Sequence, residues 1–148
     1  MSDQTGGTYT LVIELPAAAD IDVGALGTQQ FDAGWYAYVG SALGPGGFSR
    51  IERHRELAAG ERDTRHWHVD YLLGHSESRL DSAVKTHGVD GECTVAGSLD
   101  EPARSGFGCS DCDCETHLFV APARDELLAD VEAAHDSLAG ATTRSQFR

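Results

Sequence analysis

The stretch GWYAYVGSALGPGGFSRIERH, residues 34–54, combines a strand pattern with a helix pattern. Its first part alternates aromatic, small and β-branched residues and stops at Gly40, which predicts a strand. The glycine-rich break GPGG follows, and the remainder predicts a helix with basic side chains. One interpretation is a strand, a turn and a solvated helix without a further role. The other is that the turn brings together four side chains: Tyr38, Ser41, Arg50 and His54.

Further strands and helices surround this stretch. Apolar and β-branched residues predict strands over residues 7–15, 78–86 and 117–121. Apolar stripes predict helices over residues 47–59, 91–99 and 124–138. The segment HWHVDYLL, residues 66–73, fits a strand and a helix equally well. This mixture predicts a small α/β or α+β layer fold.

The length and charge of the chain limit its class. Its 148 residues suffice for one core, and we expect a single domain over residues 1–140 with a flexible tail over residues 141–148. No apolar run approaches the roughly 20 residues of a membrane span, so we expect a cytoplasmic protein with no membrane partner. The 24 acidic against 11 basic residues give a net charge of -13, which is typical of halophilic proteins.

Basic residues gather in one segment despite this acidity. Residues 50–65 hold five of the ten arginines against four acidic residues, and three histidines lie in or beside the segment. A cationic island in an acidic protein is a candidate anion site. The alternative is a helix face of Glu–Arg pairs three or four residues apart.

Several motifs resemble known families. The triplets Gly7-Thr8-Tyr9 and Tyr38-Val39-Gly40, with a helix that carries Arg50, resemble the GIY-YIG nuclease superfamily. The segments GWYAYVGSALG, RIERH, HWHVDYLL and FGCSDCDCETHLF are similar to the mainly archaeal family labelled domain of unknown function 123, over roughly residues 7–119. The resemblance implies an α+β fold with a mainly antiparallel sheet of about three strands flanked by helices. It also implies an inserted loop between the tyrosine motifs and a cysteine-rich loop.

The resemblance further implies a metal-dependent nuclease that acts on DNA phosphodiesters, with DNA repair as its context. The implied catalytic residues are Tyr9, Tyr38, Arg50, His54 and Glu92. One tyrosine would help to activate the attacking water, the arginine would contact the phosphate, and the glutamate would bind Mg²⁺ or Mn²⁺. The expected substrate-binding residues are Gly40, Ser41, Arg53, His66 and His68. The alternative is a catalytically inactive, zinc-stabilised module of the same fold that binds nucleic acid or a protein.

A cysteine cluster predicts a structural metal site. The spacing Cys109-x₂-Cys112-x-Cys114-x₂-His117 supplies three thiolates and an imidazole, which suit tetrahedral Zn²⁺. Because the spacing is tight, Cys93 or one of the histidines of HWHVDYLL is an alternative fourth ligand. A disulfide and thiols that only pack remain alternatives, although a cytoplasm disfavours the disulfide.

The histidines of HWHVDYLL form a second polar cluster with a neighbouring carboxylate. His66, His68 and Asp70 suit metal ligation or a phosphate contact. The alternative is a pair of buried, hydrogen-bonded histidines without a direct role in chemistry.

Overall fold

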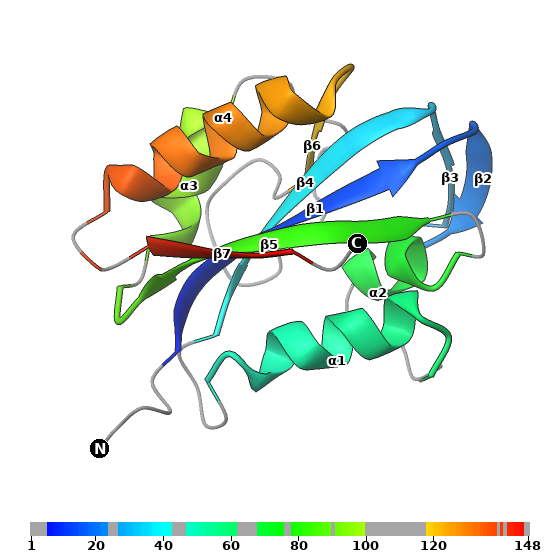
Figure 1. Cartoon of the computed structure of the whole chain (residues 1–148). Coiled ribbons are helices and arrows are strands. Elements are labelled where there is room, and N and C mark those ends of the chain that lie inside the picture. The colour runs from blue at the N-terminus through cyan, green and yellow to red at the C-terminus, as the bar shows by residue number, and fades with distance from the viewer. Residues whose placement is uncertain are drawn as a thin grey trace.

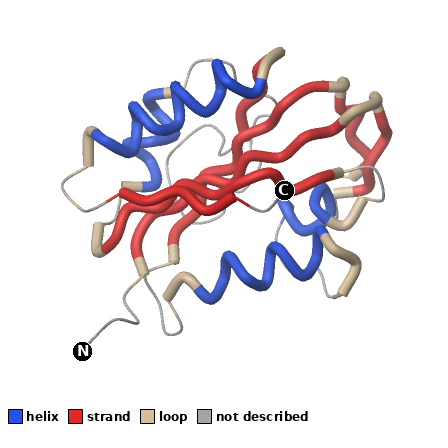
Figure 2. Tube along the Cα trace, viewed as in Figure 1, coloured by secondary structure: helices blue, strands red, loops and turns tan. Residues whose placement is uncertain are grey.

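The computed structural model describes residues 6–23, 27–42, 47–61, 68–75, 78–89, 91–99, 118–138, 140 and 142–146. It shows an α+β fold, as expected: an antiparallel sheet lies between two layers of helices (Figures 1 and 2). The strands of this sheet are β1 (Gly7–Leu15), β4 (Gly34–Ser41), β5 (Arg79–His87), β6 (Leu118–Ala121) and β7 (Thr142–Gln146). The helices are α1 (Ser49–Ala58), α2 (His68–Leu73), α3 (Glu92–Ser98) and α4 (Arg124–Asp136).

The main sheet has five strands in the order β6-β4-β1-β5-β7, and each neighbouring pair is antiparallel. The expectation of about three strands was therefore wrong. The expected loose tail was also wrong, because residues Thr142–Gln146 pair with Ser82–Thr86 of β5. The segment TTRSQ is polar and half-buried or exposed, so its sequence lacks the apolar alternation that marks a strand. Backbone pairing with β5 orders it instead.

The segment between the two tyrosine motifs forms a small sheet of its own. Strands β2 (Ala19–Asp22) and β3 (Thr28–Phe31) pair in antiparallel fashion. Ile21 and Phe31 are buried in the same apolar cluster as Leu15 at the end of β1. The inserted segment thus extends the core beyond the main sheet.

Strand β1 lies at the centre of the sheet and separates two apolar layers. Its residues Leu11, Ile13 and Leu15 join the cluster that contains α1 and α2. Val12 joins the second cluster, with residues of α3 and α4. Because side chains alternate along a strand, helices on both faces leave nearly all of β1 buried. Figure 1 shows α1 and α2 below the sheet and α3 and α4 above it.

The segment HWHVDYLL, which fits a strand and a helix equally well, contains helix α2 from His68 onward. Val69, Leu72 and Leu73 have no exposed surface and belong to the cluster on the α1 side. This helical spacing turns one apolar face of α2 toward the sheet. No helix among the described residues is long and apolar enough to cross a membrane.

Candidate functional site

The two motif tyrosines lie on the same face of the sheet, under α1. In the antiparallel register, Tyr9 is opposite Gly40 and Leu11 is opposite Tyr38, so the tyrosines are diagonal neighbours. Their side chains belong to the cluster that also contains Ile51 of α1. Tyr9 is 2% exposed and Tyr38 is 6% exposed, so both rings are held by packing.

The glycine of the second motif makes room for the Tyr9 ring. A Cβ atom at Gly40 would lie 2.5 Å from Cζ and 2.6 Å from the hydroxyl oxygen of Tyr9. These separations are shorter than any normal contact, so a larger residue at this position would displace the ring. Gly40 is therefore buried against the Tyr9 ring, and the substrate contact expected for it stays a prediction.

Helix α1 presents His54 to this ring. The buried residues of α1 are Ile51, His54 and Leu57, three residues apart, so the histidine occupies a core-facing position. The Tyr9 hydroxyl lies 2.9 Å from Nε2 of His54, which is a hydrogen-bond distance. The Tyr38 ring also contacts the imidazole, with ring centroids 6.4 Å apart and planes at 69°. The tyrosine motifs and α1 thus meet at one histidine.

Asp70 of α2 completes a buried polar chain on the far side of the imidazole. Its Oδ1 atom lies 3.7 Å from Nδ1 of His54. Arg53 donates to both of its carboxylate oxygens, at 3.2 and 3.0 Å, and the carboxylate has no exposed surface. Such a two-point ion pair fixes the orientation of α2 against α1. Arg53 pairs with Asp70, and the substrate contact expected for it stays a prediction.

The charge state of His54 follows from this environment. Burial lowers the pKa of His54 to about 4, against a partial opposing effect of Asp70, while Arg53 and Arg50 add to the lowering. His54 is therefore neutral near pH 7. The nearby Asp70 carboxylate favours the tautomer with the proton on Nδ1, which leaves Nε2 to accept a hydrogen bond from Tyr9. The neutral imidazole thus orients the phenol, while its lowered pKa makes it a weak base.

Arg50 and Ser41 lie together at the end of β4. The Nη1 atom of Arg50 donates to the backbone carbonyl of Ser41. Ser41 is opposite Thr8, the neighbour of Tyr9, so the arginine lies near the start of β1. Both side chains are half-buried. Arg50 lies one helical turn before His54, as the motif spacing predicts, and the two residues lie on the same side of the sheet.

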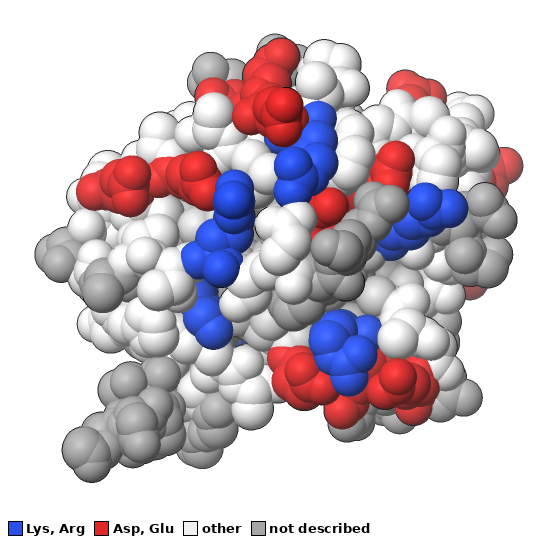
Figure 3. Space-filling model, in the orientation of Figure 1, with Lys and Arg blue, Asp and Glu red and all other residues white. Residues whose placement is uncertain are grey.

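The contacts of Arg55 on α1 agree with the alternative interpretation of residues 50–65, a helix face of Glu–Arg pairs. It donates to Glu52 at 2.9 and 2.6 Å and also lies 3.5 Å from Glu61. These contacts are exposed, and pairs of this kind contribute little to stability. The outer side of α1 is therefore a face of Glu–Arg pairs. On the face shown in Figure 3, basic side chains form separate groups with acidic side chains between them.

Glu92 is the first residue of a helix on the other face of the sheet. Glu92 begins α3, whose residues Val95 and Ala96 pack into the cluster on the α4 side of the sheet. The backbone N–H of Gly91 donates to the Thr8 hydroxyl at 2.7 Å, which holds the start of α3 on that side. After β5 the chain crosses to the face opposite to α1, and the expected convergence of Glu92 with Tyr9 and the residues of α1 stays a prediction.

The remaining candidates cannot be placed. His66, Cys109, Cys112, Cys114 and His117 lie outside the described residues. For His68 the structure gives only its position as the first residue of α2. In the part of the chain that the structure describes, no three His, Cys, Asp or Glu side chains form a group that could hold a metal ion. The zinc site therefore stays a prediction.

A second buried histidine lies on the opposite face and was not predicted from the sequence. His135 of α4 has no exposed surface, and its Nε2 and Nδ1 atoms lie 2.7 Å from the Thr10 hydroxyl and 2.9 Å from the Thr86 hydroxyl. Burial lowers the pKa of His135 to about 4. The histidine falls in the apolar stripe of α4, next to Ala134 and one turn after Val131, and that position is the sequence signal for its burial.

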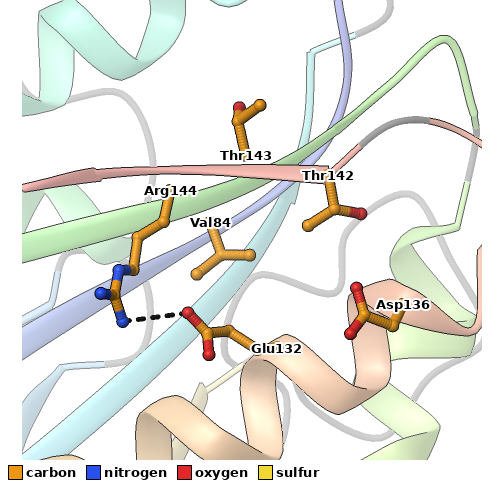
Figure 4. A pocket seen from close by; sticks show the side chains of 6 residues that line it. All are labelled: Val84, Glu132, Asp136, Thr142, Thr143 and Arg144. Carbon is orange, nitrogen blue, oxygen red and sulfur yellow. Dashed lines mark hydrogen bonds and ion pairs between the residues drawn. The ribbon is translucent and has the colours of Figure 1, made fainter.

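A hollow of about 170 Å³ lies beside this histidine, between α4 and the β5–β7 edge (Figure 4). Its lining residues are Val84, Glu132, Asp136, Thr142, Thr143 and Arg144. Arg144 and Glu132 form an ion pair at 3.0 Å along one side. The hollow is lined mainly from the α4 side of the sheet, away from Tyr9 and His54, so it is not part of the tyrosine site.

The geometry defines the class of protein: an α+β protein with a buried Tyr–His–Asp–Arg chain between the sheet and α1 and α2. Residues 8–140 match the family described as domain of unknown function DUF123, and the chain belongs to that family. No curated protein and no solved structure matches the chain.

Proposed function

We propose that the chain is a phosphodiester hydrolase of the GIY-YIG type that acts on DNA. The observation that carries this proposal is the hydrogen bond between Tyr9 and the neutral His54, at 2.9 Å. Cleavage of a phosphodiester requires a group that removes a proton from the attacking water. In this proposal Nε2 of His54 accepts the hydrogen bond of the Tyr9 hydroxyl and so orients the Tyr9 oxygen, which accepts a hydrogen bond from the attacking water. The proton that the water loses is carried by solvent to the leaving oxygen.

Arg50 supplies the positive charge for the phosphate in this proposal. Its planar guanidinium can bind two phosphoryl oxygens at once and balance the charge that develops on them. Its position near the start of β1 places it on the same side of the sheet as the Tyr9–His54 pair. Arg53 has a different role: its pairing with Asp70 positions α2 and keeps the carboxylate beside His54.

The divalent cation expected at Glu92 has no part in the steps proposed here. Helix α3, which begins at Glu92, packs on the face opposite to α1. We therefore assign no step to Mg²⁺ or Mn²⁺ bound there. A requirement for either ion in cleavage is a separate outcome of the experiment below.

A binding module of the same fold without catalysis is the second candidate. The nearly complete burial of Tyr9, His54 and Asp70 favours it, because the same contacts serve as a polar tie between the sheet and the two helices. In this case the chain would bind nucleic acid or a protein, with the predicted zinc loop as a structural element. The two candidates differ in whether Arg50 acts in cleavage or only in binding.

One assay separates the candidates. Branched, flapped and damaged DNA are incubated at molar salt with Mg²⁺, with Mn²⁺ or with chelator, and bound and cleaved DNA are both measured. The hydrolase proposal predicts cleavage by the wild-type chain, a loss of about 100-fold or more in Arg50→Met, and wild-type rates in Glu92→Ala. Binding of DNA without cleavage under every condition supports the second candidate and rejects the first.

A further inference from the structure

Lys85 lies directly beside Tyr9 on the other neighbouring strand. The register of β1 and β5 places Tyr9 opposite Lys85, and directly opposite residues of antiparallel strands point to the same face. The Tyr9 ring lies over Gly40 of β4, so its hydroxyl points away from β5. Lys85 therefore occupies the β5 side of Tyr9, on the face that carries α1.

An aromatic ring fixes the position of the ammonium group. The Nζ atom of Lys85 lies 5.3 Å from the centroid of the Phe48 ring, which is a cation–π distance. Phe48 is in turn held edge-on by His87, with ring centroids 5.1 Å apart and planes at 85°. His87 lies two residues after Lys85 on the same strand, so both point to the α1 face. All three side chains are half-buried and reach the surface.

Lys85 differs from the other basic residues in its type and in its pairing. It is the only lysine of the chain, whose other ten basic residues are arginines. Several described arginines pair with carboxylates, namely Arg53, Arg55, Arg124 and Arg144. Among the described residues, the ion pairs do not include Lys85. In a protein with a net charge of -13, an unneutralised cation beside the candidate site marks a position for an anion.

We propose that Lys85, oriented by Phe48, binds a second phosphate of the substrate strand. This inference rests on the proposed function, because it takes Tyr9 and Arg50 as the site of the first phosphate. The Arg50 guanidinium of α1 donates to the Ser41 carbonyl of β4, and Lys85 lies on β5, so the two cations flank β1. A nucleic-acid strand with one phosphate at each cation would pass the start of α1, where Phe48 and Arg50 lie, and Lys85 would set its register.

The test measures binding without cleavage. Fluorescently labelled flapped DNA is titrated in chelator at several KCl concentrations with the wild-type chain, Lys85→Met, Lys85→Arg and Arg144→Met. Arg144 is the matched control, because it lies on the adjacent edge strand opposite Val84 and therefore points to the other face. The proposal predicts binding about 5-fold weaker for Lys85→Met and a salt slope lower by about 0.7 to 0.9. Lys85→Arg and Arg144→Met should bind as the wild type does.

The outcomes separate this inference from the proposed function. Equal binding by Lys85→Met and the wild type, or an equal loss in Arg144→Met, overturns the role of Lys85 even if DNA is cleaved. No binding of DNA by the wild-type chain also overturns it. Conversely, a selective loss in Lys85→Met with no cleavage under any condition keeps the phosphate contact and rejects the hydrolase.

Discussion

The hydroxyl of Tyr9 on the central strand lies 2.9 Å from Nε2 of His54 on α1. This contact joins two residues that are 45 positions apart in the sequence and places them at the meeting point of both tyrosine motifs and the helix. The neutral imidazole accepts the hydrogen bond of the phenol and orients its oxygen, and the buried Asp70 behind it favours the tautomer that this requires.

Gly40→Ala should destabilise the fold by about 1–3 kcal/mol, because the added methyl group meets the Tyr9 ring and the surrounding core cannot open freely. The displaced ring should also lose its hydrogen bond to His54. Urea unfolding at molar salt measures the change. Gly97→Ala is the control, since a Cβ atom there has nothing within 4 Å, and it should leave stability equal or slightly higher. Equal effects of the two substitutions would contradict the packing of Tyr9 against Gly40.

The effects of substituting Arg53 and Asp70 on the free energy of unfolding should be strongly coupled. Asp70→Leu leaves Arg53 partly buried without its charge partner and should cost about 3–5 kcal/mol of unfolding free energy. The double variant Arg53→Met with Asp70→Leu removes both charges and should recover most of that loss. A double-mutant cycle from urea unfolding tests this expectation. Additive effects of the single substitutions would show that the pair does not hold α2 against α1.

Stability should fall on acidification between about pH 6.5 and pH 4. His54 and His135 have their pKa values lowered to about 4 by burial, whereas the unfolded chain binds the same protons near pH 6.5. The unfolded state therefore binds more protons in this window, so the stabilisation is complete above pH 6.5 and is lost as the pH falls toward 4. Each histidine should contribute up to about 3 kcal/mol.

Urea unfolding between pH 5 and pH 7 measures this effect where most carboxyl groups stay ionised. The charged groups that shift the pKa of His54 are Asp70, Arg53 and Arg50. Asp136 shifts the pKa of His135. His135→Gln should remove about half of the pH dependence and leave the part due to His54. A constant free energy of unfolding across this range would contradict the burial of both histidines.

The sequence predicts the interior of this fold better than its edges. The strands β1, β4 and β5 could be predicted, because their apolar and β-branched residues are buried. The approach of α1 to the tyrosines could also be predicted, because the buried face of α1 repeats every three residues, at Ile51, His54 and Leu57. Strand β7 could not, because a polar edge strand is ordered by backbone pairing alone.

Three features depend on long-range packing. The pairing of Arg53 with Asp70 arises only when α1 and α2 meet, and the local pattern of either helix gives no sign of it. The apolar stripe of α3 predicts a buried face but not which side of the sheet that face covers. The adjacency of Lys85 and Tyr9 requires the register of β1 and β5, which a bulge at Val12 and Ile13 shifts.

The cysteine motif predicts about one zinc ion per chain. Protein purified without chelator should contain it, and Cys109→Ser and Cys112→Ser should each release it, because loss of one thiolate opens the tetrahedral shell. Metal analysis of the folded chain measures the ratio. Cys93→Ser serves to test the alternative fourth ligand and should keep the zinc if His117 completes the shell. A ratio near zero in the wild-type chain would rule out the zinc site.

The central claim is that the Tyr9 hydroxyl takes part in cleavage of DNA. The most direct measurement is single-turnover cleavage by Tyr9→Phe and the wild-type chain at molar salt, with the free energy of unfolding of each measured in parallel. Tyr9→Phe should fold with a free energy of unfolding about 1 kcal/mol lower than that of the wild-type chain. It should cleave at least about 100-fold more slowly. A Tyr9→Phe variant that cleaves at the wild-type rate would contradict the account and leave the Tyr9–His54 contact as a structural tie.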